Sequence, residues 1–305
     1  MYKTYNVMAE PKSSLNFERV KWKLSIKLSA CTLGYNRQTT VEEAVRRIAK
    51  VGYKGVDLYT GAPHAWPQDF SSDERRALKK LISDLDLKLT GFAVAGGGLG
   101  LQYNFSNPRE SIRRNTLQYY RDNIKLASDL DCPLMNVLTG HVLYGTSKEQ
   151  AMKWTMDALH ELVAEAEKTK FVLGLHPQYI AESPLMITVD DALQMIKELG
   201  SSLVQIIYDT AQQNISYRNF MDDIRKAGKH LCYVHGADND GVRWTHEALG
   251  KGTVDWEGIV IALKEIGYNG YICTQSWSEL PNDVDSVMRE SKEFLEKVFE
   301  KVGVS

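Results

Sequence analysis

One short joint occurs twice in the chain, near its two ends. Residues 49–56 read AKVGYKGV, and residues 264–271 read KEIGYNGY. In both copies the end of a predicted helix is followed by a glycine, a tight turn and the start of an apolar run. Glycine at that position suits the left-handed backbone conformation that ends many α-helices. Two copies of one helix-to-strand joint indicate a repeated unit of helix and strand.

Short apolar runs recur along the chain between and around these joints. Eight runs rich in Val, Ile and Leu occupy residues 24–31, 55–59, 88–95, 134–138, 171–175, 204–208, 231–234 and 270–274. Near-continuous apolar runs are typical of parallel strands that are covered on both faces. Segments with apolar residues at helical spacing occupy residues 41–49, 78–85, 152–166, 192–199, 259–266 and about 283–302.

Side chains suited to helix N-caps stand before several of these helical segments. The expected caps are Thr40, Ser71, Thr146 and Thr188. The first three of them have a glutamate three residues later, which is the spacing of a capping box. These residues predict where the helices begin.

Eight strands that alternate with helices favour a closed (β/α)₈ barrel over the alternative, a doubly wound open sheet. A length of 305 residues suits one such barrel, and no break in composition marks a second domain. We therefore predict an α/β protein with one barrel domain over residues 23–305 and an N-terminal extension over residues 1–22.

Composition and charge disfavour several classes of protein. The net charge is −2, so no surface for a polyanion such as nucleic acid is indicated. The four cysteines are widely spaced without a CxxC pair, which predicts buried free thiols in a reducing compartment. No apolar run approaches the ~18 residues of a membrane span, and residues 1–23 lack the apolar stretch of a signal peptide. We expect a cytoplasmic protein that binds neither nucleic acid nor membrane.

Polar side chains gather where the predicted strands end. In (β/α)₈ barrels the active site forms at the carboxyl ends of the strands, so these side chains are the candidates for chemistry. Three of the seven histidines are among them. The candidates are Asp57, Tyr59, Thr139, His141, His176, Gln178, Asp209, Gln212, His235, Asp238, Gln275, Ser276 and Trp277.

From about residue 24 onward the sequence resembles a known superfamily. The motifs that carry the resemblance are GYKGVDL (52–58), LGLHP (173–177), IIYDTAQ (206–212), VHGAD (234–238), LGKGTVDW (249–256) and GYNG (267–270). In this order they are similar to the xylose-isomerase-like TIM barrels, which include sugar isomerases and epimerases, inosose dehydratases and family-2 apurinic endonucleases. The resemblance implies a small polyhydroxylated substrate.

The resemblance also implies a divalent metal, held by a Glu on strand five, an Asp on strand six, a His on strand seven and a Glu on strand eight. Asp209 and His235 match this pattern. His176 and Gln275 stand where the two glutamates are expected, and Gln212 stands where many members have a further His. The glutamates hold the metal and move protons in the isomerases and epimerases, so their absence bears on the mechanism.

A site of His176, Asp209, His235 and Gln275 has one negatively charged ligand. Two imidazoles and one carboxylate shift the preference from Mg²⁺ toward Mn²⁺, Zn²⁺, Fe²⁺ or Co²⁺, with Mn²⁺ expected first. The higher net charge on such a centre strengthens its Lewis acidity. General base catalysis then needs another group.

His141 is the first candidate for that base, because its unperturbed pKa suits neutral pH, and Asp238 and Asp57 are the next candidates. Each also has a purely structural interpretation. His141 can be an ordinary loop residue, and Asp57 can pair with a neighbouring cation. In the same way Asp209 can cap the following helix and His235 can be a satisfied strand-end histidine.

We predict substrate binding by a set of aromatic and amide side chains: Tyr59, Gln178, Gln212, Trp244 and Trp277. The aromatic rings among them can stack on the apolar face of a sugar ring, and the alternative is ordinary packing between loops. The glycine-rich residues 96–100 suit a mobile loop over the site rather than a dinucleotide-binding turn, because no good helix start follows them.

Three functions remain open from the sequence. The first is a sugar, keto-sugar or inositol isomerase or epimerase that uses enolate-type proton transfer. The second is a lyase of the same superfamily, such as a keto-inositol dehydratase or the catalytic subunit of a C-glycoside-cleaving enzyme, because β-elimination needs one base. The third is a barrel that has lost its metal and serves as a binding or partner subunit. The resemblance implies a homo-oligomer, with a small accessory subunit as the alternative.

Overall fold

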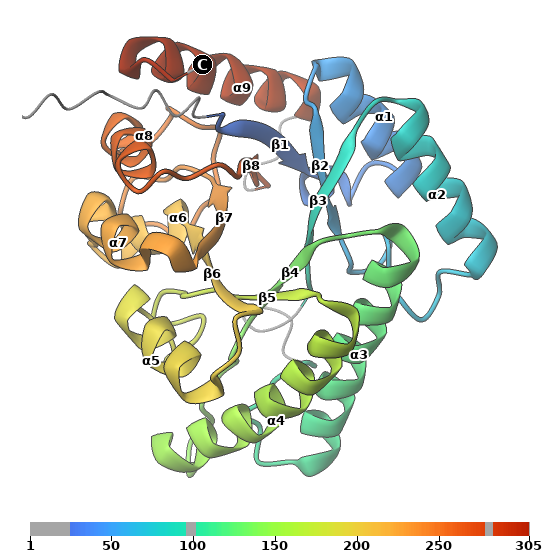
Figure 1. The fold of residues 1–305 in the computed structure, drawn as a ribbon, viewed down its shortest axis with the longest axis vertical. Coiled ribbons are helices and arrows are strands. Elements are labelled where there is room, and N and C mark those ends of the chain that lie inside the picture. The colour runs from blue at the N-terminus through green and yellow to red at the C-terminus, as the bar shows by residue number, and fades with distance from the viewer. Residues whose placement is uncertain (1–24, 96–101, 278–282, 305) are drawn as a thin grey trace, which may run out of the picture.

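The computed structural model describes residues 25–95, 102–277 and 283–304. Its strands form a closed parallel barrel in the order β1 to β8, and the helices lie around the outside (Figure 1). The strands are β1 (Lys27–Cys31), β2 (Gly55–Tyr59), β3 (Lys88–Ala93), β4 (Leu134–Val137), β5 (Val172–Leu175), β6 (Val204–Asp209), β7 (Leu231–Gly236) and β8 (Tyr271–Thr274). The predicted (β/α)₈ barrel and its eight strands are confirmed.

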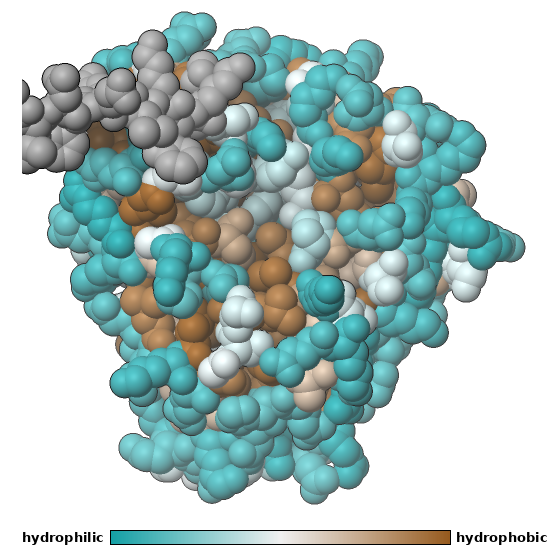
Figure 2. Space-filling view, in the orientation of Figure 1, coloured by the Kyte–Doolittle hydropathy of each residue, from teal (hydrophilic) through white to brown (hydrophobic). Residues whose placement is uncertain are grey.

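Helices follow the strands around the barrel, and short 3₁₀ helices accompany them at Thr32–Tyr35 and Gly228–His230. The α-helices are α1 (Val41–Val51), α2 (Ser72–Asp84), α3 (Glu110–Leu130), α4 (Lys148–Thr169), α5 (Val189–Leu199), α6 (Thr210–Ile215), α7 (Phe220–Ala227), α8 (Trp256–Glu265) and α9 (Val284–Val302). Figure 2 shows polar side chains around the outer helices of one face, with hydrophobic ones gathered toward its middle. Within the described residues, no helix is long and apolar enough to cross a membrane.

Most of the predicted helix starts are confirmed. The hydroxyls of Thr40, Ser71 and Thr188 accept the N–H of the third residue of their helices, and Ser71 and Thr188 form full capping boxes. The predicted cap at Thr146 is wrong, because Ser147 accepts the N–H of Gln150 and α4 begins one residue later than expected.

The sequence pattern did not predict α3, α6 or α7. Helix α3 is long, but Arg109 at its N-cap makes no side-chain capping bond. Its buried face also includes the polar residues Thr116 and Asn123, which interrupt the apolar spacing. Helices α6 and α7 are too short for a clear helical period.

The repeated joint has the backbone conformation that its glycines predicted. Gly52 ends α1 with φ = +97°, and Gly267 follows α8 with φ = +70°. Both angles lie in the left-handed region that residues with a Cβ rarely adopt. Each joint therefore turns the chain directly from a helix into the next strand, β2 or β8.

A small core of strand residues lies inside the barrel, beneath the side chains at the carboxyl ends of the strands. Its buried members are Cys31, Ala93, Leu134, Ile207, Tyr233 and Cys273. The Tyr233 hydroxyl bonds to Ser29 and Thr90 across the barrel. Because alternate residues of a strand share a face, Ile207 and Tyr233 lie one layer below the site residues of β6 and β7.

The four cysteines are free, as predicted. Cys31, Cys132 and Cys273 are buried, and Cys232 is half-buried. The proposed extension over residues 1–22 and the glycine-rich residues 96–100 lie outside the described residues.

Candidate active site

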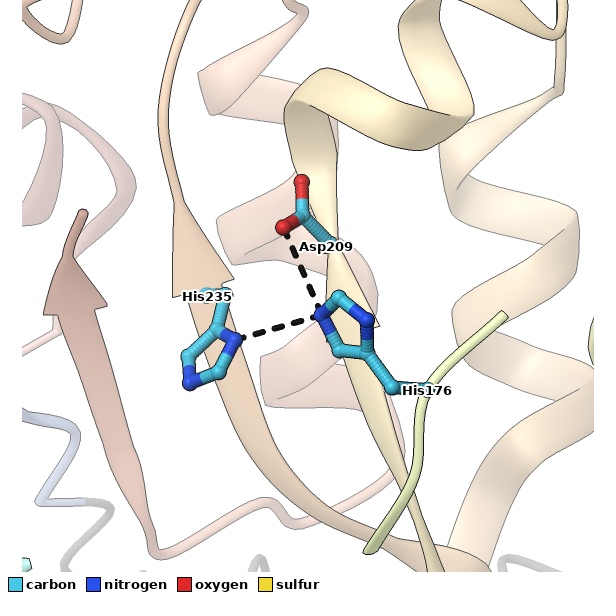
Figure 3. A group of neighbouring side chains, drawn as sticks. All are labelled: His176, Asp209 and His235. Atoms are coloured by element: carbon cyan, nitrogen blue, oxygen red, sulfur yellow. Dashed lines mark hydrogen bonds and ion pairs between the residues drawn. The ribbon is translucent and has the colours of Figure 1, made fainter. Parts of the chain in front are cut away.

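Three side chains from consecutive strands converge at the carboxyl end of the barrel (Figure 3). His176 follows β5, Asp209 is the last residue of β6, and His235 lies near the end of β7. The Nε2 atom of His176 lies 3.4 Å from Oδ2 of Asp209 and 3.2 Å from Nδ1 of His235. All three side chains are buried. We call these three residues the triad.

The geometry of the triad fits a divalent metal. One donor atom from each residue lies within 4.8 Å of the others. Two ligand atoms that are each about 2.1 Å from a tetrahedral metal ion are themselves about 3.4 Å apart, which is close to the measured separations. The donors are two imidazole nitrogens and one carboxylate oxygen, a set that suits Mn, Fe, Co or Zn better than Mg.

Asp209 has two functions in the fold. Its Oδ1 accepts the N–H of Gln212 and caps α6, so the structural interpretation of this residue is confirmed. Its Oδ2 faces His176 and also lies 3.8 Å from Nε2 of His246. Burial alone raises the pKa of Asp209, but hydrogen bonds and charges from the two histidines outweigh it and hold that pKa well below its ordinary range. Asp209 is therefore a permanent carboxylate.

Burial lowers the pKa of His176, and the neighbouring Asp209 offsets only part of this effect. A neutral imidazole has a free lone pair, which is the form that binds a metal. Its Nδ1 is buried and has no hydrogen-bond partner among the described residues.

Asp57 lies on the other side of His235 from His176. Its Oδ2 is 3.8 Å from Nε2 of His235, beyond hydrogen-bond distance, and within the described part of the chain neither atom has a hydrogen-bond partner. The thiol of Cys31 donates to Oδ1 at 3.5 Å. A Cβ on Gly91 would lie 2.8 Å from Oδ2, so a glycine there leaves room for the carboxylate. This placement suits a residue that orients His235 more than one that reaches a substrate.

Asp238 is occupied by the loop that follows β7. Its carboxylate accepts four hydrogen bonds, from the backbone N–H groups of Asn239, Gly250 and Val254 and from Nε1 of Trp256. The role that this geometry supports is organisation of the loop rather than proton transfer.

Two buried residues of the site were not among the predicted ones. His246 contacts Asp209, and Glu182 interacts electrostatically with His141, His246 and Asp209. Burial is the main cause that raises the pKa of Glu182. Both residues lie within βα loops, several positions beyond a strand end, where strand register does not predict which side chains reach the site. Their location in the long loops after β5 and β7 is the signal that was available.

The other predicted polar residues lie around the triad. His141 is half-buried in the loop after β4, and its backbone oxygen accepts bonds from Asn104 and Ser106. Gln275 is buried just beyond β8, where its backbone N–H donates to Gly236.

The predicted amide residues Gln178 and Gln212 are both buried. The side-chain oxygen of Gln212 accepts the N–H of Tyr179, and that of Gln178 has no hydrogen-bond partner among the described residues. Gln178 therefore retains a buried acceptor near the triad.

The predicted aromatic residues fall into two groups. Trp244 and Trp277 contact each other, with ring centroids 5.2 Å apart. Tyr59, on β2, instead contacts His64 at 6.5 Å. The two tryptophans are therefore the stronger candidates for one shared binding surface.

Comparison with known proteins places the chain in a family. The family model described as "Xylose isomerase-like TIM barrel" matches residues 45–298. The chain belongs to this family. The resemblance expected from the sequence motifs is thus confirmed.

Several proteins similar to this chain are epimerases by name. The chain is 24% identical to fructoselysine 3-epimerase of Shigella flexneri over 246 residues, which cover 81% of this chain and 88% of the relative. It is 25% identical to D-psicose 3-epimerase of Ruminiclostridium cellulolyticum over 270 residues, which cover 85% of each chain.

Solved structures share the barrel. A D-tagatose 3-epimerase-like protein superposes with a TM-score of 0.78 at 21% identity, covering 91% of this chain and 98% of that chain. The 3-keto-D-glucoside 4-epimerase from E. coli gives a TM-score of 0.76 at 20% identity, covering 90% and 100%. At these identities the likeness supports the fold.

Proposed function

We propose that the protein is a metal-dependent epimerase or isomerase of a keto-sugar, acting by proton transfer at a carbon next to a carbonyl. The observation that carries this proposal is the triad of His176, Asp209 and His235 at the ends of three consecutive strands. The family match and the named epimerases among the relatives agree with a sugar isomerase- or epimerase-like enzyme. These relatives act on keto-sugars or their derivatives, as their names state.

The triad would hold the metal, with Gln275 as the predicted further ligand. A divalent ion bound there supplies Lewis acidity toward the carbonyl and hydroxyl oxygens of a substrate. One carboxylate and two imidazoles favour Mn, Zn, Fe or Co over Mg, and Mn²⁺ is the ion of this group that we expect first. Asp57 faces Nε2 of His235 at 3.8 Å while Nδ1 faces His176, so the ring presents one nitrogen to the site and Asp57 would favour that orientation.

Proton transfer falls to Glu182 and His141. Epimerisation removes a proton from one face of a carbon and returns one to the other face, so two acid–base groups suit it. Burial raises the pKa of Glu182 and so brings this carboxyl closer to the working range of a general base at neutral pH. His141, in the loop after β4, interacts electrostatically with Glu182. Glu182 and His141 would thus take over the proton transfer of the two glutamates that the family pattern has at positions 176 and 275.

The absence of these two glutamates also supports a lyase as the second candidate. With His176 and Gln275 at the positions of the glutamates, a single base acting on a substrate with a leaving group next to the acidic carbon gives β-elimination. Product analysis separates the two reactions, since an epimer keeps the mass of its substrate and an elimination product has lost the leaving group.

Metal content of the purified chain, measured by plasma mass spectrometry, tests the proposal. We expect about one equivalent of Mn, Zn, Fe or Co in the wild type, and loss of the ion in Asp209→Ala and His235→Ala. His160→Ala is the matched control, because this histidine is exposed on α4 far from the triad in the barrel. If the wild type binds no ion even after incubation with excess Mn²⁺, the metalloenzyme proposal is wrong and a metal-free binding subunit takes its place.

A further inference from the structure

Three large aromatic rings lie close together on loops at the mouth of the barrel. Trp244 is in the loop after β7, Trp277 follows β8, and Tyr179 follows β5. The Trp244 and Trp277 rings have centroids 5.2 Å apart and planes at 70°, and Tyr179 lies 6.1 Å from Trp244 with planes at 31°. All three side chains are half-buried, so part of each remains open to solvent. We call these three residues the aromatic corner.

His246 joins the aromatic corner to the triad. Its ring stacks on Trp277 with centroids 4.6 Å apart, and its backbone oxygen accepts the N–H of Trp277 at 3.0 Å. On its other side, Nε2 of His246 lies 3.8 Å from Oδ2 of Asp209. The corner is therefore one buried imidazole ring away from the proposed metal ligand.

Two exposed apolar residues lie near these rings in the sequence. Ile180 follows Tyr179 and is 65% exposed, and Val242 precedes Trp244 by two residues and is 73% exposed. The loops that carry the rings therefore also present apolar side chains to solvent.

The shape of the corner favours a flat ring over a second sugar. A sugar ring needs one aromatic platform, because its hydroxyls occupy its edges. Two indoles near a right angle instead offer a face and an edge together, and aromatic pairs prefer these offset-stacked and edge-to-face arrangements. The Nε1–H of Trp244 is buried and has no hydrogen-bond partner among the described residues, so it suits an oxygen substituent of a bound ring.

We infer that the substrate is a sugar linked to an aromatic group, with the sugar at the triad and the aromatic group in the aromatic corner. This inference rests on the proposed function for the position of the sugar. It adds the chemical class of the substituent, which is planar, apolar and oxygen-bearing, as in an aryl glycoside whose sugar ring also carries the ketone that proton transfer requires.

Calorimetric titration of the full-length, Mn²⁺-loaded chain with matched phenyl and methyl glycosides of glucose, galactose and fructose tests this inference. In the best-bound pair we expect the phenyl glycoside to bind at least about tenfold more tightly, as two favourable ring contacts provide. Trp244→Ala should bring the two affinities together by weakening the phenyl glycoside more than the methyl glycoside, whereas Trp244→Phe should keep part of the preference. Trp154→Ala is the control, because this half-buried tryptophan packs against Arg113 on the outer helices.

Equal affinities for phenyl and methyl glycosides in the wild type overturn the inference, as does failure to bind any of these glycosides. A Trp244→Ala variant that weakens both members of the pair equally also overturns it. Turnover of keto-sugars tests the proposed function separately from this binding preference. Turnover of an unsubstituted keto-sugar without any phenyl preference leaves that function standing, whereas a phenyl preference without turnover of any keto-sugar removes it.

Discussion

Asp209 and Asp57 are both buried carboxylates of barrel strands, and each faces a histidine of the site. Asp209 is bonded on one oxygen to the start of α6 and faces two histidines with the other. Among the described residues, Asp57 has only the Cys31 thiol on one oxygen and His235 beyond the other. The comparison shows that a strand-end position brings a carboxylate to the site, while the partners from other elements decide whether it can be a ligand or a support.

Replacing Asp209 should have the largest effect on metal binding. In Asp209→Asn the amide keeps an oxygen for the N–H of Gln212, so the cap of α6 survives while the charge is lost. We expect the Mn²⁺ affinity to fall by more than the ~100-fold that loss of an outer partner of a ligand costs. Calorimetric titration measures the affinity, and thermal unfolding checks the fold. An unchanged affinity in a folded variant would remove Asp209 from the ligand set.

Replacing Asp57 should weaken the same site less. Asp57→Asn removes the carboxylate behind His235, so the ring is no longer fixed with Nδ1 toward His176, and we expect the Mn²⁺ affinity to fall about 10- to 100-fold. Nitrogen-15 NMR of the histidine rings should show Nε2 of His235 protonated in the wild type and a mixture of tautomers in the variant. Asp86→Asn is the control, because this carboxylate pairs with Lys54 at the surface. If Asp57→Asn binds Mn²⁺ as tightly as the control, Asp57 does not support the site.

Gly91→Ala should disturb Asp57 and the core beneath it, but not Asp209. The added Cβ would lie 2.8 Å from Oδ2 of Asp57 and 2.9 Å from Cδ1 of Leu134, so both side chains must move. We expect a loss of Mn²⁺ affinity below about tenfold and a drop of ~1–3 kcal/mol in the free energy of unfolding from overpacking. Denaturant unfolding and the same titration measure the two effects. A loss of affinity equal to that of Asp209→Asn would contradict the division between ligand and support.

The smallest expected effect concerns the start of α4, away from both carboxylates. Ser147→Ala removes the hydroxyl that accepts the N–H of Gln150 and should lower the free energy of unfolding by ~1 kcal/mol. Thr146→Ala should have little effect, because Thr146 is not the cap. Denaturant unfolding of the two variants decides between them, and the reverse order would restore the cap expected from the sequence. Neither variant should change Mn²⁺ binding.

Local sequence patterns predicted most of the barrel. Strand positions follow from apolar runs, and Gly52 and Gly267 adopt the conformation that the repeated joint required. The pattern failed for α3, because the buried polar residues Thr116 and Asn123 interrupt the apolar spacing of its face. Thr116 accepts the N–H of Asn104 from outside the helix, and Asn123 donates to the backbone oxygen of Tyr119 within it.

The candidate site was predictable to the extent that it stands on strands. Asp209, His176 and His235 follow from strand register, but Glu182 and His246 lie in loops whose paths depend on packing. Asp238 shows that a position after a strand end does not by itself make a residue part of the site. It follows a strand as the others do, yet its donors Gly250, Val254 and Trp256 come from much later in the same loop and from the start of α8.

The most direct test of the central proposal follows deuterium by NMR. Keto-sugars, with and without an aryl substituent, are incubated in D₂O with Mn²⁺-loaded wild type, His235→Ala and the His160→Ala control. We predict that wild type and control place deuterium on the carbon next to the carbonyl and produce its epimer, while His235→Ala does neither. Absence of exchange in all three proteins, or equal exchange in His235→Ala and wild type, would contradict proton transfer at the triad.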